Sequence, residues 1–543
     1  MRFTLSIALL CTSAFAQLTT AQRESDFRTL ANLVGRYYAP LEWKKTALGV
    51  DPFDLSPWLA RVRAVKNDIE FHRVCVDYLG QLKDGHVSYL VPSTFFADAR
   101  LRVDLYDGKL LIEAVNRTTY PAAQFPQFAV GNEVVSVDGR PALAIVEELA
   151  KTNPAGSGRA ALRSAANDLF IRAQIIYPEA SLLPDTSEVV VRNAAGEQFT
   201  YTAKWTKSGL AVGDIPTPVS PSSPARRSLE TELKLPFETP DRRSLRVRRT
   251  FLEQHSGPEP PLVIQGQDSG QTLGEPQAVL GFGSRTPYYA LPAGFVVRRG
   301  RLQTDNFFSG TYVADGLRIG LIRIPSFFPS DPLAAIQEFS AEITFLKANT
   351  DGLVIDVTRN GGGYAGLPQA YFSRLTTRPF SAPPSQLLPA VGDMLGYEQL
   401  AELISGLTRE AWVNAKWRWL ADEVTKTYKA GNRLLTIPLP LYFETGVNLL
   451  QRGPLYDDNF PWRDNAGQTL GYDKPVITLV DDFSASAADL FPAMFQDNQR
   501  GLIVGTPTMG LGGAIVDFDP ALPFTQAAIS LTTTLTHRKR VQK

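Results

Sequence analysis

Short apolar strands alternate with helical segments from about residue 311 to the end of the chain. Runs rich in Leu, Ile and Val predict buried strands at 317–324, 352–357, 476–480 and 502–505. Apolar residues at helical spacing predict helices at 334–348 and 485–496. This alternation favours an α/β fold around a largely parallel sheet, in which ligands bind at the carboxyl ends of the strands.

The residues after the second of these strands could form a tight binding loop. The segment 356–366 contains three consecutive glycines beginning at Gly361, whose backbone N–H groups can approach a ligand oxygen closely. Gly361, Gly363 and Gly366 also match the spacing of a dinucleotide-binding loop, but no Asp or Glu follows before Gly392 to hold a ribose. A plain strand-to-helix turn is the alternative, and no cofactor is expected.

A serine-rich segment follows the strand at 476–480. Ser484 and Ser486 lie at the start of the predicted helix 485–496. A serine in this place can act as a nucleophile, because the amides of a helix N-terminus stabilise an oxyanion. The alternative is that both serines only cap the helix.

His86 is the candidate general base for such a serine. It follows an Asp-Gly turn, whereas His72 falls within a helical pattern and His255 in a Pro-rich segment, so these two are expected to be structural or exposed. A lysine base is excluded by position, since no lysine follows Ser486 before Lys539. The few histidines show no paired ligand spacing, so no metal is expected.

The chain before residue 311 has four parts of different character. Residues 1–16 combine a basic start, an apolar run and a small-x-small triplet, which predicts an export signal. Helical spacing over 23–95 predicts a helical region that carries His86. Alternating strands around two Asp-Gly turns predict a β-rich module over 96–206. Residues 207–310 are expected to be a linker or insertion, because their first part is rich in Pro and Arg.

The balance of charges excludes some classes of partner. Lys plus Arg and Asp plus Glu both number 55, which argues against nucleic acid as the main partner. The two cysteines, Cys11 and Cys75, are too few for a disulfide scaffold or a zinc site built on thiolates. No later apolar run approaches the length of a transmembrane segment. We therefore expect an exported protein without a transmembrane segment.

Several motifs in one order resemble those of the C-terminal processing (tail-specific) serine protease family. They comprise Leu-Lys-Asp-Gly-His at 82–86, the turn at 131–139, Arg-Asn-Gly-Gly-Gly at 359–363, Phe-Ser-Ala-Ser-Ala-Ala-Asp at 483–489 and Val-Gly-Thr-Pro-Thr-Met-Gly at 504–510. The resemblance is to the triad branch, which includes the tricorn core and a secreted chlamydial protease. It implies a crotonase/ClpP-like core at 311–543, with 96–206 as a PDZ-like module inserted between base and nucleophile.

The resemblance also implies roles for individual residues. Ser486, not Ser484, falls on the nucleophile, and His86 on the general base. The amide of Ala487 with that of Gly362 or Gly363 would form the oxyanion hole, and a protein or peptide would be the substrate.

The chain departs from the family in two places. Leu511 stands where members with a Ser–Lys dyad have the lysine, which excludes that dyad. No Glu follows Ser486, although the triad branch has one after its last strands. Either the core is incomplete after Lys543 or the chain lacks the full triad, so a non-catalytic peptide- or lipid-binding member is the alternative function. A crotonase-like hydrolase or isomerase that binds coenzyme A is a third.

Overall fold

The computed structural model describes most of the chain between residues 17 and 538. The described ranges are 17–152, 156–214, 281–302, 304–364, 366–407, 411–431, 433–439, 461–464 and 466–538. The predicted export signal, His255 and the Pro- and Arg-rich part of 207–310 lie outside these ranges.

Helices form the first part of the described chain, as the sequence predicts. They are α1 (Thr20–Tyr37), α2 (Leu41–Leu48), α3 (Ser56–Ala64) and α4 (Asp68–Gly80). Helix α1 begins at a capping box in which Thr19 and Gln22 satisfy each other's backbone amides. The helices pack around a buried aromatic cluster that includes Phe27, Phe71 and Tyr78.

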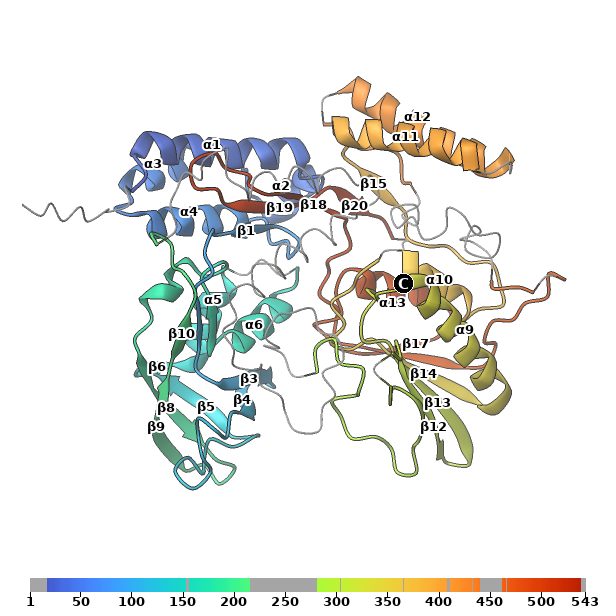
Figure 1. Cartoon of the computed structure of the whole chain (residues 1–543), viewed down its shortest axis with the longest axis horizontal. Coiled ribbons are helices and arrows are strands. Elements are labelled where there is room, and N and C mark those ends of the chain that lie inside the picture. The colour runs from blue at the N-terminus through green and yellow to red at the C-terminus, as the bar shows by residue number, and fades with distance from the viewer. Residues whose placement is uncertain are drawn as a thin grey trace, which may run out of the picture.

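The last strands of the chain return to these N-terminal helices. Strands β1 (Ser88–Leu90), β19 (Ala528–Thr532) and β18 (Ile515–Phe518) form an antiparallel sheet in the order β1-β19-β18. Ile529 and Leu531 of β19 are buried in the same core as the helices. In Figure 1 the red C-terminal strands accordingly lie among the blue helices. Strand β20 (Thr534–Thr536) pairs with β15 (Ser385–Leu387).

A β-rich module follows, and it holds the two predicted hairpin turns. Its elements are β2 (Phe96–Asp98), β3 (Leu101–Tyr106), β4 (Lys109–Val115), β5 (Glu133–Val137), β6 (Arg140–Pro141), α5 (Ala142–Ala150), α6 (Gly158–Asn167), β7 (Ile171–Ala173), the 3₁₀ helix η1 (Pro178–Leu182), β8 (Thr186–Arg192), β9 (Gln198–Lys204) and β10 (Thr206–Ser208). Asp107-Gly108 and Asp138-Gly139 have positive φ at both residues, as type I′ turns require.

A six-stranded sheet forms the centre of the second half. It has the order β11 (Val296–Arg299), β12 (Phe308–Ala314), β13 (Leu317–Arg323), β14 (Gly352–Asp356), β16 (Val476–Val480) and β17 (Leu502–Gly505). Strands β13, β14, β16 and β17 are parallel, as predicted. Helices α9 (Pro332–Asn349), α10 (Gly366–Ser373) and α13 (Ala487–Asp497) pack with the sheet around one core. Strand β11 shows that the segment 207–310 contributes to this sheet.

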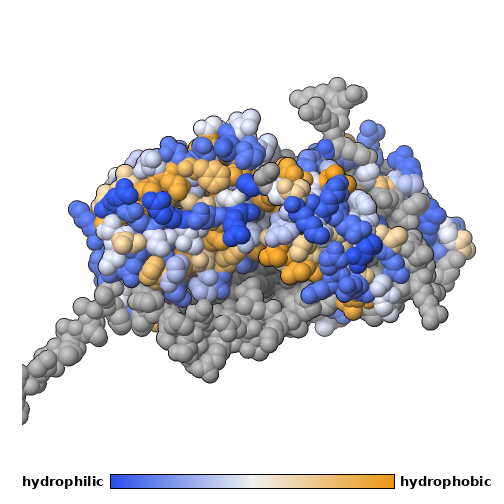
Figure 2. Space-filling view, turned by 90° about the horizontal axis from the view of Figure 1, so that it is seen from above, coloured by the Kyte–Doolittle hydropathy of each residue, from blue (hydrophilic) through white to orange (hydrophobic). Residues whose placement is uncertain are grey.

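A helical hairpin between β15 and β16 was not predicted. Helices α11 (Val391–Leu407) and α12 (Ala411–Ala430) pack on each other around Trp417, Leu420 and Val424 and stand away from the sheet at the top of Figure 1. Seen from above, apolar patches alternate with hydrophilic ones across the molecule (Figure 2).

Candidate active site

The glycine loop and the serine loop meet at one edge of the central sheet. Strands β14 and β16 are parallel neighbours, with Asp356 opposite Leu479, so the loops after both leave the same edge. The loops are joined directly, because the Ala485 N–H donates to the Asn360 carbonyl oxygen at 3.0 Å. The two strand ends singled out from the sequence therefore form one site.

Gly362 lies directly against Ser486. A Cβ added to Gly362 would come within 2.7 Å of the Ser486 Cβ and 2.9 Å of the Ala487 nitrogen. The φ of Gly362 is +98°. No larger residue fits there without displacing the serine. The Gly362 N–H donates to Oδ1 of Asn360 at 2.9 Å.

The next amide in the loop is oriented differently. Gly363 forms a bridge to Phe327, in which Phe327 bonds to the residues on either side of Gly363. Within the described part of the chain, the N–H groups of Gly363 and Ala487 have no hydrogen-bond acceptor. These two amides, rather than that of Gly362, are available to a ligand oxygen.

Ser486 has a strained backbone conformation at the start of α13. Its φ of +54° and ψ of −116° are rare for a residue with a side chain and mark a sharp strand-to-helix turn. Its N–H donates to Oδ2 of Asp489 at 2.8 Å. Asp489 also accepts from the amides of Gly510 at 2.9 Å and Leu511 at 2.8 Å. Burial raises the pKa of Asp489, although these hydrogen bonds oppose the shift.

Ser484 is a structural residue. It is fully buried. Its Oγ donates to the Val357 carbonyl oxygen at 2.8 Å and accepts from the Asp481 N–H at 3.0 Å. Ser484 therefore ties the serine loop to the end of β14 and has no hydroxyl hydrogen to spare.

His86 belongs to a different part of the molecule, the turn between α4 and β1. The backbone N–H of His86 donates to Oδ1 of Asp84 at 3.0 Å. Oδ2 of Asp84 accepts from the Tyr38 hydroxyl at 3.0 Å and from Thr532 Oγ1 at 2.9 Å. Burial and the Asp84 carboxylate together raise the pKa of Tyr38. The backbone of His86 is thus anchored to α1 and to β19.

The imidazole of His86 is not anchored in this way. Its Nδ1 is buried and has no hydrogen-bond partner among the described residues. No hydrogen bond joins His86 to Ser486 within those residues. His72, by contrast, is buried in α4 and bonds to the Tyr89 hydroxyl at 2.9 Å, as expected of a structural histidine.

Three of the four aspartates that follow Ser486 bond to residues other than His86. Asp489 holds the Ser486 amide, and Asp497 pairs with Arg538 at 2.7 Å. Asp517 accepts from the hydroxyl of Ser530. Within the described residues, no hydrogen bond joins Asp489 or Asp497 to the His86 imidazole.

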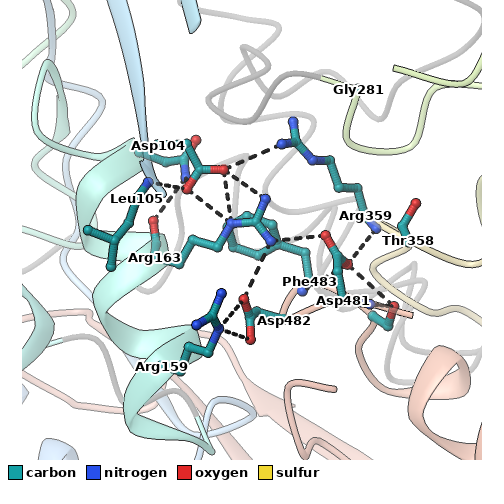
Figure 3. A network of polar contacts seen from close by, with 12 residues as sticks. Asp104, Leu105, Arg159, Arg163, Gly281, Thr358, Arg359, Asp481, Asp482 and Phe483 are labelled. Atoms are coloured by element: carbon teal, nitrogen blue, oxygen red, sulfur yellow. Dashed lines mark hydrogen bonds and ion pairs between the residues drawn. The ribbon is translucent and has the colours of Figure 1, made fainter. Parts of the chain in front are cut away.

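A buried ion network beside the site was missed in the sequence. Arg163 of α6 and Arg359 of the glycine loop share Asp104 of β3, and Arg163 also reaches Asp481 of the serine loop (Figure 3). No local pattern could have revealed it, since Arg163 and Asp481 are 318 residues apart.

The described residues contain neither a cluster of metal ligands nor a transmembrane helix. No group of three or more His, Cys, Asp or Glu side chains among them could hold a metal ion. No helix among them is long and apolar enough to cross a bilayer.

Comparisons with known proteins agree with this architecture. Residues 410–536, which include Ser486, match Peptidase family S41, and residues 101–213 match the PDZ domain family. A protein of Chlamydia trachomatis is 27% identical over 531 residues, covering 90% of this chain and 81% of that protein. A protein of Chlamydia muridarum is 26% identical over 530 residues, with the same coverage.

The fold also matches solved structures. The crystal structure of mature CPAF has a TM-score of 0.70 at 21% identity and covers 96% of this chain and 90% of that one. The expected fold class, an α/β protease core with helices and a PDZ module, is confirmed, and the S41 match supports a peptidase function.

Proposed function

We propose that this chain, whose residues 410–536 match Peptidase family S41 and whose fold matches that of mature CPAF, is a serine endopeptidase with Ser486 as its nucleophile and His86 as its general base. The observation that carries the proposal is the backbone of Ser486. A non-glycine residue at φ +54°, at the start of a helix and against a glycine loop, is strain that a merely capping serine does not need.

The proposed reaction is acyl transfer to Ser486. His86 takes the hydroxyl proton as Oγ attacks the peptide carbonyl carbon, and a tetrahedral intermediate forms. The N–H groups of Ala487 and Gly363 donate to its oxyanion, and each such donor typically contributes about 3 kcal/mol. His86 then protonates the leaving amine, and water releases the acyl group by the reverse steps.

Gly362 has a supporting part in this mechanism. Of the two glycines that the family resemblance offers for the oxyanion hole, Gly362 already donates its N–H to Asn360. We therefore assign the donor role to Gly363, and to Gly362 the close approach that seats the serine.

The PDZ module and the predicted signal fit the same function. A PDZ domain binds extended peptide segments at a sheet edge, so residues 96–206 are proposed to hold a protein substrate. We also propose export through residues 1–16. N-terminal sequencing of the protein from its own host should begin at Gln17, and an intact Met1 would contradict export.

Cleavage of unfolded casein tests the proposed chemistry. Ser486→Ala should abolish cleavage while the thermal unfolding midpoint stays near that of the wild type. Ser405→Ala, on the exposed surface of α11, is the matched control and should retain full activity. Full activity of Ser486→Ala would contradict the assignment.

Two observations favour a second function, a peptide-binding protein without turnover. The Nδ1 of His86, which has no partner among the residues that the structure describes, and the apolar Leu511 are what a relative that has lost its catalytic apparatus would show. In that case the wild type and His86→Ala would bind unfolded casein equally and neither would cleave it.

A further inference from the structure

We propose that Arg163, a residue of the PDZ module, is a positioning residue for the oxyanion hole of the protease core. Arg163 would act on the oxyanion hole through Asp481. The PDZ module would then be a structural part of the active site. This inference rests on the proposed serine protease function.

Arg163 is firmly held on its own side. Its Nε lies 3.0 and 2.9 Å from the two oxygens of Asp104, and its Nη2 donates to Oδ2 of Asp104 at 2.8 Å. Asn167, one turn further along α6, donates to the same carboxylate at 3.2 Å. Asp104 is fully buried. This bidentate pairing fixes the plane of the guanidinium, so its remaining nitrogen points in one direction.

That nitrogen crosses to the serine loop of the core. Nη1 of Arg163 donates to Oδ2 of Asp481 at 3.0 Å and lies 3.6 Å from Asp482. The guanidinium also lies 4.3 Å from the centre of the Phe483 ring. Figure 3 shows the two side chains next to each other. Arg163 thus contacts three consecutive residues shortly before the nucleophile.

Asp481 passes this constraint to both halves of the site. Its Oδ1 accepts the Arg359 N–H at 2.8 Å and the Phe483 N–H at 3.2 Å. Arg359 has a φ of +53° and directly precedes Asn360, whose side chain holds the Gly362 amide. One carboxylate therefore fixes the start of the glycine loop with one oxygen and receives Arg163 with the other.

A second arginine crosses the interface in the opposite direction. Nη2 of Arg359 donates to Glu113 Oε1 at 3.0 Å and to the Tyr106 hydroxyl at 3.2 Å, both in the module. Arg359 and Arg163 are both buried. Because a buried charge that loses its partner is costly, module and core are expected to keep this arrangement together.

The module also touches the segment that follows the nucleophile helix. A Cβ added to Gly156, just before α6, would lie 2.7 Å from the Met509 carbonyl oxygen and 3.0 Å from that of Gly510. Gly510 in turn donates to Asp489, which holds the Ser486 amide. The segment just before α6 therefore lies against the core at a second point, close to a residue that binds Asp489.

The experiment compares a short ester substrate, which needs no module for binding, with casein. Arg163→Met should lower kcat for the ester about tenfold or more with little change in KM, because the hole donors lose their alignment. Arg163→Lys, which keeps the charge but not the fork, should restore part of the loss. Arg140→Met is the matched control. Arg140 also lies in the module, but it pairs with Glu148 at 2.6 Å on the exposed surface, so activity should stay within about twofold.

The outcomes separate this inference from the proposed function. If Arg163→Met keeps the wild-type kcat on the ester and only raises KM for casein, the module merely captures substrate and the inference is overturned. A kcat loss that only follows the folded fraction, measured by thermal unfolding, also overturns it. If Arg163→Met does not fold, Asp481→Asn should give the same kcat loss, and wild-type kcat in that variant counts against the inference. A wild type that cleaves neither substrate contradicts the proposed function itself.

Discussion

The two catalytic candidates are held in very different ways. Ser486 lies where two neighbouring strands end, with its amide bound by Asp489, its Cβ against Gly362 and a helix starting at the next residue. His86 lies in a turn of another unit, and only its backbone is fixed, through Asp84. The nitrogen that should set its tautomer has no partner among the described residues.

This difference shows which parts of such a site the backbone can build and which part needs a further side chain. Backbone hydrogen bonds and close packing are enough to build a nucleophile turn and an oxyanion hole. A general base also needs a second group to orient its ring, and losing that group typically costs about 10⁴-fold in kcat. The nucleophile side should therefore be intact whatever the activity of the whole protein.

Removal of the base should have the largest effect. His86→Ala should lower kcat on casein about 10³-fold, since a positioned base contributes up to about 10⁴-fold. His72→Asn is the matched control, because Asn can still bond to Tyr89, and it should keep wild-type kcat. Equal kcat for His86→Ala and the wild type would show that His86 is not the base.

Crowding of Ser486 should cause the second largest loss of kcat. Gly362→Ala places a methyl group within 2.7 Å of the Ser486 Cβ, so kcat should fall about 10²-fold while KM changes little. Gly396→Ala is the control, because a Cβ there meets no atom within 4 Å. Wild-type kcat in Gly362→Ala would show that the loop is not closed on the serine.

Loosening of the base's anchor should have a smaller effect. Asp84→Ala removes the acceptor of the His86 amide, the Tyr38 hydroxyl and Thr532. We expect kcat to fall about tenfold and the free energy of unfolding by about 2 kcal/mol, measured by urea titration. Tyr38→Phe, which removes one of the three bonds, should lose less in both. A larger loss in Tyr38→Phe would contradict this ranking.

The smallest effect concerns stability alone and belongs to the buried histidine, His72. Burial, with a further contribution from Arg23, lowers the pKa of His72 to about 3 from 6.5. Between these two pKa values the unfolded chain binds a proton at His72 that the folded chain excludes. The contribution of neutral His72 to the free energy of unfolding is therefore fully present above about pH 6.5 and is lost as the pH falls toward 3. Between about pH 7.5 and about pH 5 the wild type should lose about 2 kcal/mol of unfolding free energy to His72. His72→Asn should lack that part of the loss, and the same loss in both proteins would contradict the shift.

Local patterns in the sequence predicted much of the fold and half of the site. The strands at 476–480 and 502–505 and the hairpin turn at Asp107-Gly108 follow from apolar runs and turn residues, and the structure has them there. The pairing of Ser88 with Ser530 and the bonds of Asp84 to Tyr38 and Thr532 could not be predicted, because they join segments that are distant along the chain.

The same reason explains the missed contacts of the site. The glycine loop and the serine loop could be predicted because each directly follows a strand whose apolar residues indicate it in the sequence. The Arg163–Asp481 contact depends on how a module docks on a core, which no local periodicity records. The hairpin of α11 and α12 was missed although both helices are long.

A fluorophosphonate probe tests the central claim most directly, because it reports on the nucleophile without requiring a particular peptide substrate. The wild type should form one stoichiometric adduct, and peptide mapping by mass spectrometry should place it on Ser486, with no adduct in Ser486→Ala. An adduct on Ser484 or another residue, or an unmodified Ser486 in folded wild-type protein, would contradict the account.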